Sequence, residues 1–173
     1  MAGMQQSYSP IPRFFSQPSA HSAAEPAADE VIHPVEHPLV DSFNRYHNYL
    51  RISVTERCNL RCTYCMPAEG VELTPEADIL SLDEHKQVIS IFAALGVTKL
   101  RITGGEPTVY KGLLELIRHA KSIPTITNVG ITTNGMKLKS MLPELVKAGL
   151  DSVNISIDTL DPIKFERLSR RDR

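Results

Sequence analysis

The three cysteines of this 173-residue chain, Cys58, Cys62 and Cys65, lie close together with the spacing C-x3-C-x2-C. Thiolates are soft, anionic ligands that suit iron–sulfur clusters, zinc or copper(I). Structural zinc normally takes four ligands from two separated pairs, and no fourth cysteine is present. Three ligands would leave one iron of a [4Fe–4S] cluster open to a substrate or cofactor. The spacing therefore favours such a cluster, with a zinc site and three buried free thiols as the alternatives.

The cysteines follow a strand-like stretch, and three further polar strings, TGGEP, TTNG and SIDTLD, also follow strand-like stretches. Hydrophobic periodicity predicts strands at 49–55, 97–103, 129–133 and 151–157 and helices at 82–95, 112–121, 138–148 and 162–168. Ser81 and Glu84 have capping-box spacing for the first helix, and Gly96 is placed to end it. Pro143 favours a start of the third helix nearer Leu142, because proline disfavours a helix interior.

The alternating strand and helix order predicts an α/β fold with parallel strands and right-handed crossovers. The two architectures that fit are an open doubly wound sheet and a (β/α) barrel. In both, functional residues gather at the carboxyl ends of the strands. The cysteine loop and the three polar strings should therefore meet at one end of the sheet.

The motifs resemble those of the radical S-adenosylmethionine (SAM) superfamily, in which C-x3-C-x2-C follows the first barrel strand. Tyr64 stands at the family's aromatic position, and Gly104 to Pro107 resemble its GGEP motif. The stretches 49–67, 99–113, 131–135 and 149–165 are most similar to the GTP 3′,8-cyclases of molybdenum cofactor biosynthesis. Residues 41–45 resemble their DxFGR motif, with Asn44 where glycine is usual. The resemblance implies a partial TIM-like barrel of about four βα units and a lyase activity that converts GTP to 3′,8-cyclo-7,8-dihydroguanosine 5′-triphosphate.

The resemblance also implies roles for individual residues, with no catalytic group beyond the cofactor ligands. The three cysteines would hold the [4Fe–4S] cluster, whose open iron binds SAM. The SAM contacts would be Tyr64, Gly105 and Ser156, and the GTP contacts Arg51, Arg101 and Thr132. Two arginines suit a triphosphate because the guanidinium fork matches phosphate oxygens.

Composition divides the chain near residue 40. Residues 1–40 contain six of the 12 prolines and a single basic residue, Arg13, which predicts a disordered tail followed by the barrel domain at 41–173. The first 24 residues contain five serines and no acid, as an organelle transit peptide would. The localisation is therefore expected to be the mitochondrial matrix, or otherwise the cytoplasm. A net charge of −1 argues against nucleic-acid binding, and no apolar run is long enough to span a membrane.

The cyclases are about twice this length and carry a second three-cysteine cluster, whereas no cysteine follows Cys65 here. The chain is therefore expected to be a fragment without the second [4Fe–4S] cluster, poorly soluble or inactive in cyclisation by itself. Another radical SAM enzyme, or a non-catalytic form that pairs with the full-length enzyme, is the alternative. Besides GTP, the expected partners are an electron donor and a second copy of the chain.

Overall fold

The computed structural model describes residues 37–171. The predicted disordered tail and transit peptide therefore lie almost wholly outside the described residues. Its last residues, 37–40, are described, and they belong with the domain: Leu39 packs against the core and Val40 forms an antiparallel bridge with Tyr46. In the turn between them, Asn44 has a positive φ of 59°. Asparagine tolerates this left-handed conformation, which explains why it can stand where the cyclases usually have glycine.

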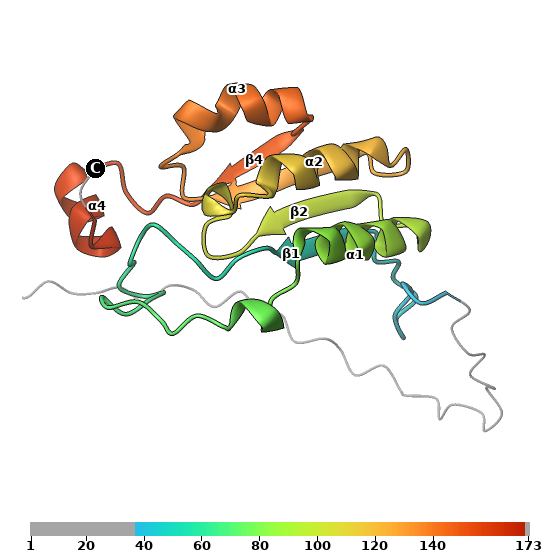
Figure 1. The fold of residues 1–173 in the computed structure, drawn as a ribbon, viewed down its shortest axis with the longest axis horizontal. Helices are drawn as coiled ribbons and strands as arrows, with labels where there is room; N and C mark the ends of the chain where they lie inside the picture. Colours follow the sequence, from blue (N-terminus) through green and yellow to red (C-terminus); the bar gives the residue numbers. More distant parts are fainter. Residues whose placement is uncertain (1–36, 172–173) are drawn as a thin grey trace, which may run out of the picture. The chain divides into compact units, whose positions relative to one another are not determined.

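Four parallel strands form one sheet in the order β1-β2-β3-β4. Figure 1 labels β1, β2 and β4 of this sheet. The strands are β1 (Tyr49–Ser53), β2 (Lys99–Thr103), β3 (Asn128–Thr133) and β4 (Ser152–Ile155). Each strand pairs with the next one along the chain, whereas a doubly wound sheet reverses its strand order at a switch point. The consecutive order therefore favours the (β/α) barrel over the open sheet.

The helices are α1 (Leu82–Ala94), α2 (Leu113–Ser122), α3 (Leu138–Ala148) and α4 (Pro162–Ser169), with short 3-10 turns at η1 (Glu76–Asp78) and η2 (Pro107–Val109). The capping box at α1 is confirmed, since Ser81 Oγ accepts from the Glu84 backbone N–H and the Glu84 carboxylate accepts from the Ser81 backbone N–H. The expected later start of α3 is wrong, because the helix begins at Leu138 and contains Pro143. Proline has no backbone N–H, so Pro143 cannot make the helical hydrogen bond to the carbonyl of Lys139, four residues earlier. Lys139 lies on the exposed side of the helix, where water can take the place of that bond.

The two faces of the sheet differ in character. Side chains on one face are buried and apolar, among them Leu100, Ile102, Val129 and Ile131, and they form the core with helices α1 to α3. Side chains at the alternate positions are polar, because successive residues of a strand point to opposite faces. A parallel sheet in an open α/β fold is usually apolar on both faces. The polar face is instead what the lumen side of a ligand-binding barrel would present.

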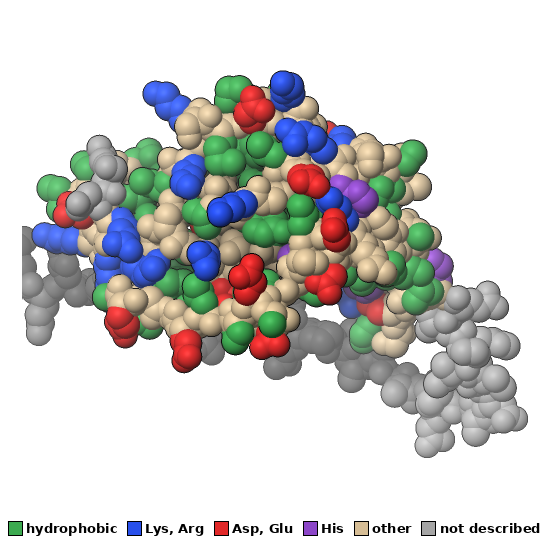
Figure 2. Space-filling model, viewed as in Figure 1, with side chains coloured by type: hydrophobic (Ala, Val, Ile, Leu, Met, Phe, Trp, Pro, Cys, Tyr) green, Lys and Arg blue, Asp and Glu red, His purple; other side chains and the backbone are tan. Residues whose placement is uncertain are grey.

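Charged side chains of both signs are interspersed over the helices on the face shown in Figure 2. Within residues 37–171, no helix combines the length and the apolarity that crossing a membrane requires. The helix-covered face has the mixed composition of an ordinary water-facing surface, and the distinctive chemistry lies at the strand ends.

Candidate active site

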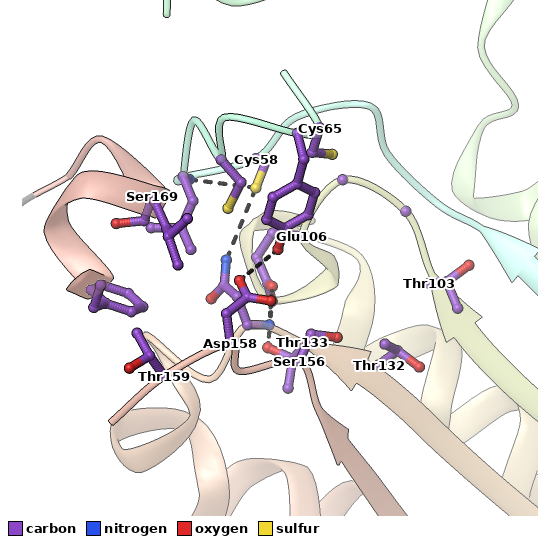
Figure 3. A pocket seen from close by; sticks show the side chains of 18 of the residues that line it. Cys58, Cys65, Thr103, Glu106, Thr132, Thr133, Ser156, Asp158, Thr159 and Ser169 are labelled. Atoms are coloured by element: carbon purple, nitrogen blue, oxygen red, sulfur yellow. Dashed lines mark hydrogen bonds between the residues drawn. The ribbon is translucent and has the colours of Figure 1, made fainter. Parts of the chain in front are cut away.

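A cavity of about 440 Å³ lies at the carboxyl ends of the strands, as predicted for a fold of this class. The cysteine loop, the loops after β2, β3 and β4, and helix α4 all contribute to its wall, as Figure 3 shows in part. Eight of the nine predicted site residues line it: Arg51, Cys58, Cys62, Tyr64, Cys65, Gly105, Thr132 and Ser156. The ninth, Arg101, is not among the lining residues. The tertiary structure thus gathers the three cysteines and the predicted SAM contacts around one space.

Hydrogen bonds within the cysteine loop, and one from the loop to the end of helix α4, hold the cysteine loop in place. The Cys65 backbone N–H donates to the Cys62 carbonyl at 2.9 Å, which makes a tight turn between these two cysteines. Arg61 Nη1 donates to the Cys58 carbonyl at 2.8 Å, and the Arg61 backbone N–H donates to the Ser169 carbonyl at 2.9 Å. Helix α4 therefore closes one side of the cavity and holds the loop. A site role for α4 was not predicted from the sequence, although the helix directly follows the SIDTLD string.

The electrostatics of the thiols suit a cationic occupant. Burial raises the pKa of the Cys62 thiol, the nearby Tyr64 side chain partly offsets the rise, and the charges of Cys58, Asp158 and Cys65 add to it. Binding of iron would provide the positive charge that lets all three thiols ionise together, with release of protons. The donor set and its common cavity therefore fit an iron–sulfur cluster.

A single metal ion fits less well. Across residues 37–171, no three His, Cys, Asp or Glu side chains converge closely enough to coordinate one ion. Tetrahedral zinc with Zn–S distances of ~2.3 Å brings its sulfur ligands within about 4 Å of one another. The thiolates of a cubane bind different irons and lie farther apart. Among residues 37–171, the three thiols are therefore not pre-arranged around a single ion.

The two glycines after β2 allow the TGGEP loop to pack directly on the cysteine loop. A Cβ on Gly104, whose φ is +139°, would lie 2.5 Å from the Thr55 carbonyl oxygen. A Cβ on Gly105 would lie 2.5 Å from the carbonyl oxygens of Glu56 and Arg57. The Gly105 N–H donates to the Thr55 carbonyl at 2.7 Å. These contacts show that the glycines are needed for the approach of two protein loops, in addition to any cofactor contact of Gly105.

Glu106, in the same loop, is a buried carboxylate with 1% exposure. Its Oε1 accepts from the Thr133 hydroxyl at 2.7 Å and from both the backbone N–H and the hydroxyl of Thr108, while its Oε2 accepts from the Asn134 backbone N–H at 2.7 Å. Four donors from the loops after β2 and β3 thus converge on one side chain. A role for Glu106 was not predicted from the GGEP motif, because burial cannot be read from a polar string in a loop.

The two predicted GTP-binding arginines lie side by side on the polar face of the sheet. Arg51 and Arg101 are register partners on β1 and β2, and Gly130 follows them in the same row on β3. Arg101 Nε donates to the Tyr49 hydroxyl at 2.8 Å, and Arg101 Nη1 donates to the Ile131 carbonyl at 3.2 Å. Within the described chain neither arginine has an Asp or Glu ion-pair partner. Two adjacent cations without carboxylates make a row that an anion would stabilise.

On the opposite side of the cavity, the predicted SAM contacts Tyr64 and Ser156 are held by neighbouring loops. The Tyr64 hydroxyl donates to Asp158 Oδ2 at 2.6 Å, and this bond raises the pKa of Tyr64 above its usual value. The Ser156 backbone N–H donates to the Thr133 carbonyl at 2.8 Å, which extends the β3–β4 pairing to the cavity rim. Asp158 thus links the cysteine loop to the end of β4, as Figure 3 shows.

Comparison with known proteins agrees with this geometry. Residues 52–173 match the Radical SAM superfamily, a match that covers well over half of the chain. The chain belongs to this superfamily. Membership implies SAM and an iron–sulfur cluster.

Curated relatives of this radical SAM chain carry consistent names. A mitochondrial GTP 3′,8-cyclase of Arabidopsis thaliana is 51% identical over 159 residues, which are 92% of this chain and 40% of that protein. Molybdenum cofactor biosynthesis protein 1 of Drosophila melanogaster is 53% identical, over 78% of this chain and 24% of that protein. A GTP 3′,8-cyclase of Lactiplantibacillus plantarum is 48% identical, over 76% and 40%. The chain spans about 40% or less of the length of these relatives.

Solved structures show the same fold. Streptococcus suis SuiB, in a crystal structure bound to S-adenosylmethionine, is 25% identical with a TM-score of 0.55, over 70% of this chain and 26% of that one. The crystal structure of BtrN in complex with AdoMet and 2-DOIA is 21% identical with a TM-score of 0.55, over 72% and 51%. The four-strand sheet of this chain is thus also found in these two solved structures.

Proposed function

We propose that this chain is the N-terminal part of a GTP 3′,8-cyclase, the radical SAM lyase that begins molybdenum cofactor biosynthesis. The observation that carries the proposal is the presence of Arg51 in the same cavity as the three cysteines. Arg51, a cation suited to phosphate groups, thus lines the same cavity as the three thiols suited to an iron–sulfur cluster. Relatives about 50% identical that are named GTP 3′,8-cyclase support this substrate.

The residues of this chain would bind, orient and shield the reactants. Cys58, Cys62 and Cys65 would ligate a [4Fe–4S] cluster, which together with SAM supplies an electron and a 5′-deoxyadenosyl radical when both are bound. The SAM contacts would be Tyr64, Gly105 and Ser156, and the GTP contacts Arg51, Arg101 and Thr132. The guanidinium groups would hold the triphosphate, and helix α4 would keep water from the cavity.

Further parts of the proposed activity involve groups outside this chain. Residues 66–173 contain no cysteine, so a second cluster like that of the cyclases would need ligands from elsewhere. An electron donor must reduce the cluster, and a second copy of the chain or the full-length enzyme would be a partner. The mitochondrial name of the Arabidopsis relative supports a mitochondrial location for this protein.

Anaerobic reconstitution of the 173-residue chain tests the cluster and SAM sites together. We expect about four irons per chain after desalting. We also expect the electron paramagnetic resonance (EPR) spectrum of the reduced cluster to change when SAM is added, because SAM would coordinate the open iron. One bound zinc, or a cluster signal that is indifferent to SAM, would contradict the proposal.

Replacement of Arg51 by leucine should weaken GTP binding by roughly tenfold or more, because a charge-assisted hydrogen bond contributes about 1.5–3 kcal/mol. Equilibrium binding of labelled GTP to the reconstituted chain measures the effect. Arg51→Lys should recover part of the affinity, since it keeps the charge but not the planar fork. Arg118→Leu, at an exposed position on α2, is the matched control and should bind GTP as the wild type does.

The main alternative is a radical SAM enzyme that modifies another class of substrate. SuiB is 26% identical to this chain in a crystal structure bound to its precursor peptide SuiA, which favours peptides as that class. Saturable GTP binding that requires Arg51 would favour the cyclase. Absence of GTP binding in a chain that carries a SAM-responsive cluster would favour the alternative.

A further inference from the structure

The side-chain amide of Asn134, in the loop after β3, has an orientation set by its own hydrogen bonds. Asn134 Oδ1 accepts from the Met136 backbone N–H at 3.1 Å, and Nδ2 donates to Asn59 Oδ1 at 2.8 Å. These two contacts identify the oxygen and the nitrogen, because a flipped amide would place a donor against a donor. The nitrogen therefore faces the cysteine loop.

The same nitrogen lies 4.0 Å from Cys58 Sγ. An amide nitrogen carries two hydrogens, so with one donated to Asn59 the other is available to the sulfur. A second donor, the Leu60 backbone N–H, lies 3.4 Å from Cys58 Sγ. Among residues 37–171, Cys58 is the cysteine whose sulfur accepts N–H donors from both the backbone and a side chain.

Buried groups anchor Asn134 in this position. Its backbone N–H donates at 2.7 Å to Oε2 of Glu106, and Oε1 of the same carboxylate holds the neighbouring Thr133 hydroxyl at 2.7 Å. Glu106 and Thr133 are 1% and 2% exposed, so both are enclosed by the fold and held by the hydrogen bond between them. The amide thus approaches Cys58 from a rigid support that connects β2 with β3.

We propose that Asn134 is a positioning residue that donates an N–H···S hydrogen bond to Cys58 and thereby raises the reduction potential of the bound cluster. This inference rests on the proposed function, since it presumes that Cys58 ligates iron. Hydrogen bonds to ligand sulfurs are among the factors that set the potentials of iron–sulfur clusters. A donor near a thiolate stabilises the reduced cluster, which carries one more negative charge than the oxidised cluster. Among the three thiols, Cys58 would thus be the cluster ligand that receives both a backbone and a side-chain N–H donor.

Potentiometric titration of the reconstituted chain, followed by EPR, tests the proposal directly. Asn134→Leu removes the donor without adding charge, and Asn134→Asp removes it while keeping the acceptor for the Met136 N–H. At a fixed applied potential, the ratio of reduced to oxidised cluster should fall about tenfold in Asn134→Leu, a shift of about 59 mV for a one-electron couple. The shift should be larger in Asn134→Asp, because a negative charge would face the sulfur.

Asn59→Ala is the matched control, since it removes one partner of the amide, while the Met136 N–H still holds the amide oxygen and so keeps the nitrogen toward Cys58. Its potential should remain that of the wild type. An unchanged potential in Asn134→Leu, or an equal shift in Asn59→Ala, would overturn the proposal. Failure of both Asn134 variants to take up iron would also overturn it, because the residue would then serve assembly of the site. Failure of the wild-type chain to take up iron would instead refute the proposed function.

Discussion

A chain with Cys62 replaced by alanine should bind at least roughly tenfold less iron than the wild type after anaerobic reconstitution. Three irons of the proposed cluster each depend on one of three thiolates, and within residues 37–171 no other cysteine can replace a lost one. Removal of one ligand would leave two irons without a protein ligand, so the cluster would be lost on desalting. Iron content and the visible absorbance of the cluster measure the effect, and Cys58→Ala and Cys65→Ala should behave alike.

Thr63→Ala is the control for this prediction, since Thr63 is an exposed residue of the same loop. It should take up iron as the wild type does. The metal-free forms of all four variants should unfold at the same denaturant concentration, because Cys58 and Cys62 are only partly buried and Cys65 is exposed. A Cys62→Ala chain that retained a full cluster would exclude the ligand set proposed above.

Replacement of Glu106 by glutamine should lower the free energy of unfolding of the metal-free chain by roughly 3 kcal/mol. The carboxylate accepts from four donors in a buried place. An amide group would present its own hydrogens to some of these donors and leave them unpaired. Urea unfolding followed by circular dichroism measures the change, and SAM binding should weaken with it, because the loops after β2 and β3 would lose their common anchor.

Glu115→Gln offers a matched comparison for Glu106. Glu115 lies on α2 with its side chain 57% exposed, where it pairs with Lys86. The loss of such a surface pair should cost less than ~1 kcal/mol. Equal destabilisation of the two variants would show that the convergence of donors on Glu106 contributes nothing to stability.

The element order followed from the sequence because its causes are local. The apolar spacing of α1 and the Ser81–Glu84 capping box act within a few residues, and both were predicted. Pro143 was misjudged for a related reason: whether a helix tolerates proline depends on whether the freed carbonyl meets water, and that depends on the rest of the fold.

The site was predictable to a lesser degree. Motif positions at successive strand ends indicated which residues would meet, and eight of the nine line one cavity. The position of Arg101 was not predictable in this way, since its hydrogen bonds to Tyr49 and to the Ile131 carbonyl depend on strand register. The contacts of Glu106 and Asn134 were also not predicted from the sequence, because each residue forms hydrogen bonds with partners in another loop.

By itself, the sequence determined the alternating strands and helices and the superfamily, because residue type and spacing along the chain suffice for these. Only the tertiary structure decided that the strands follow one another around a barrel-like sheet, that Gly104 and Gly105 serve the packing of two loops, and that Glu106 anchors Asn134 beside Cys58. These features arise where strand ends remote in sequence converge, and contacts of that kind are set by packing and register across the whole sheet.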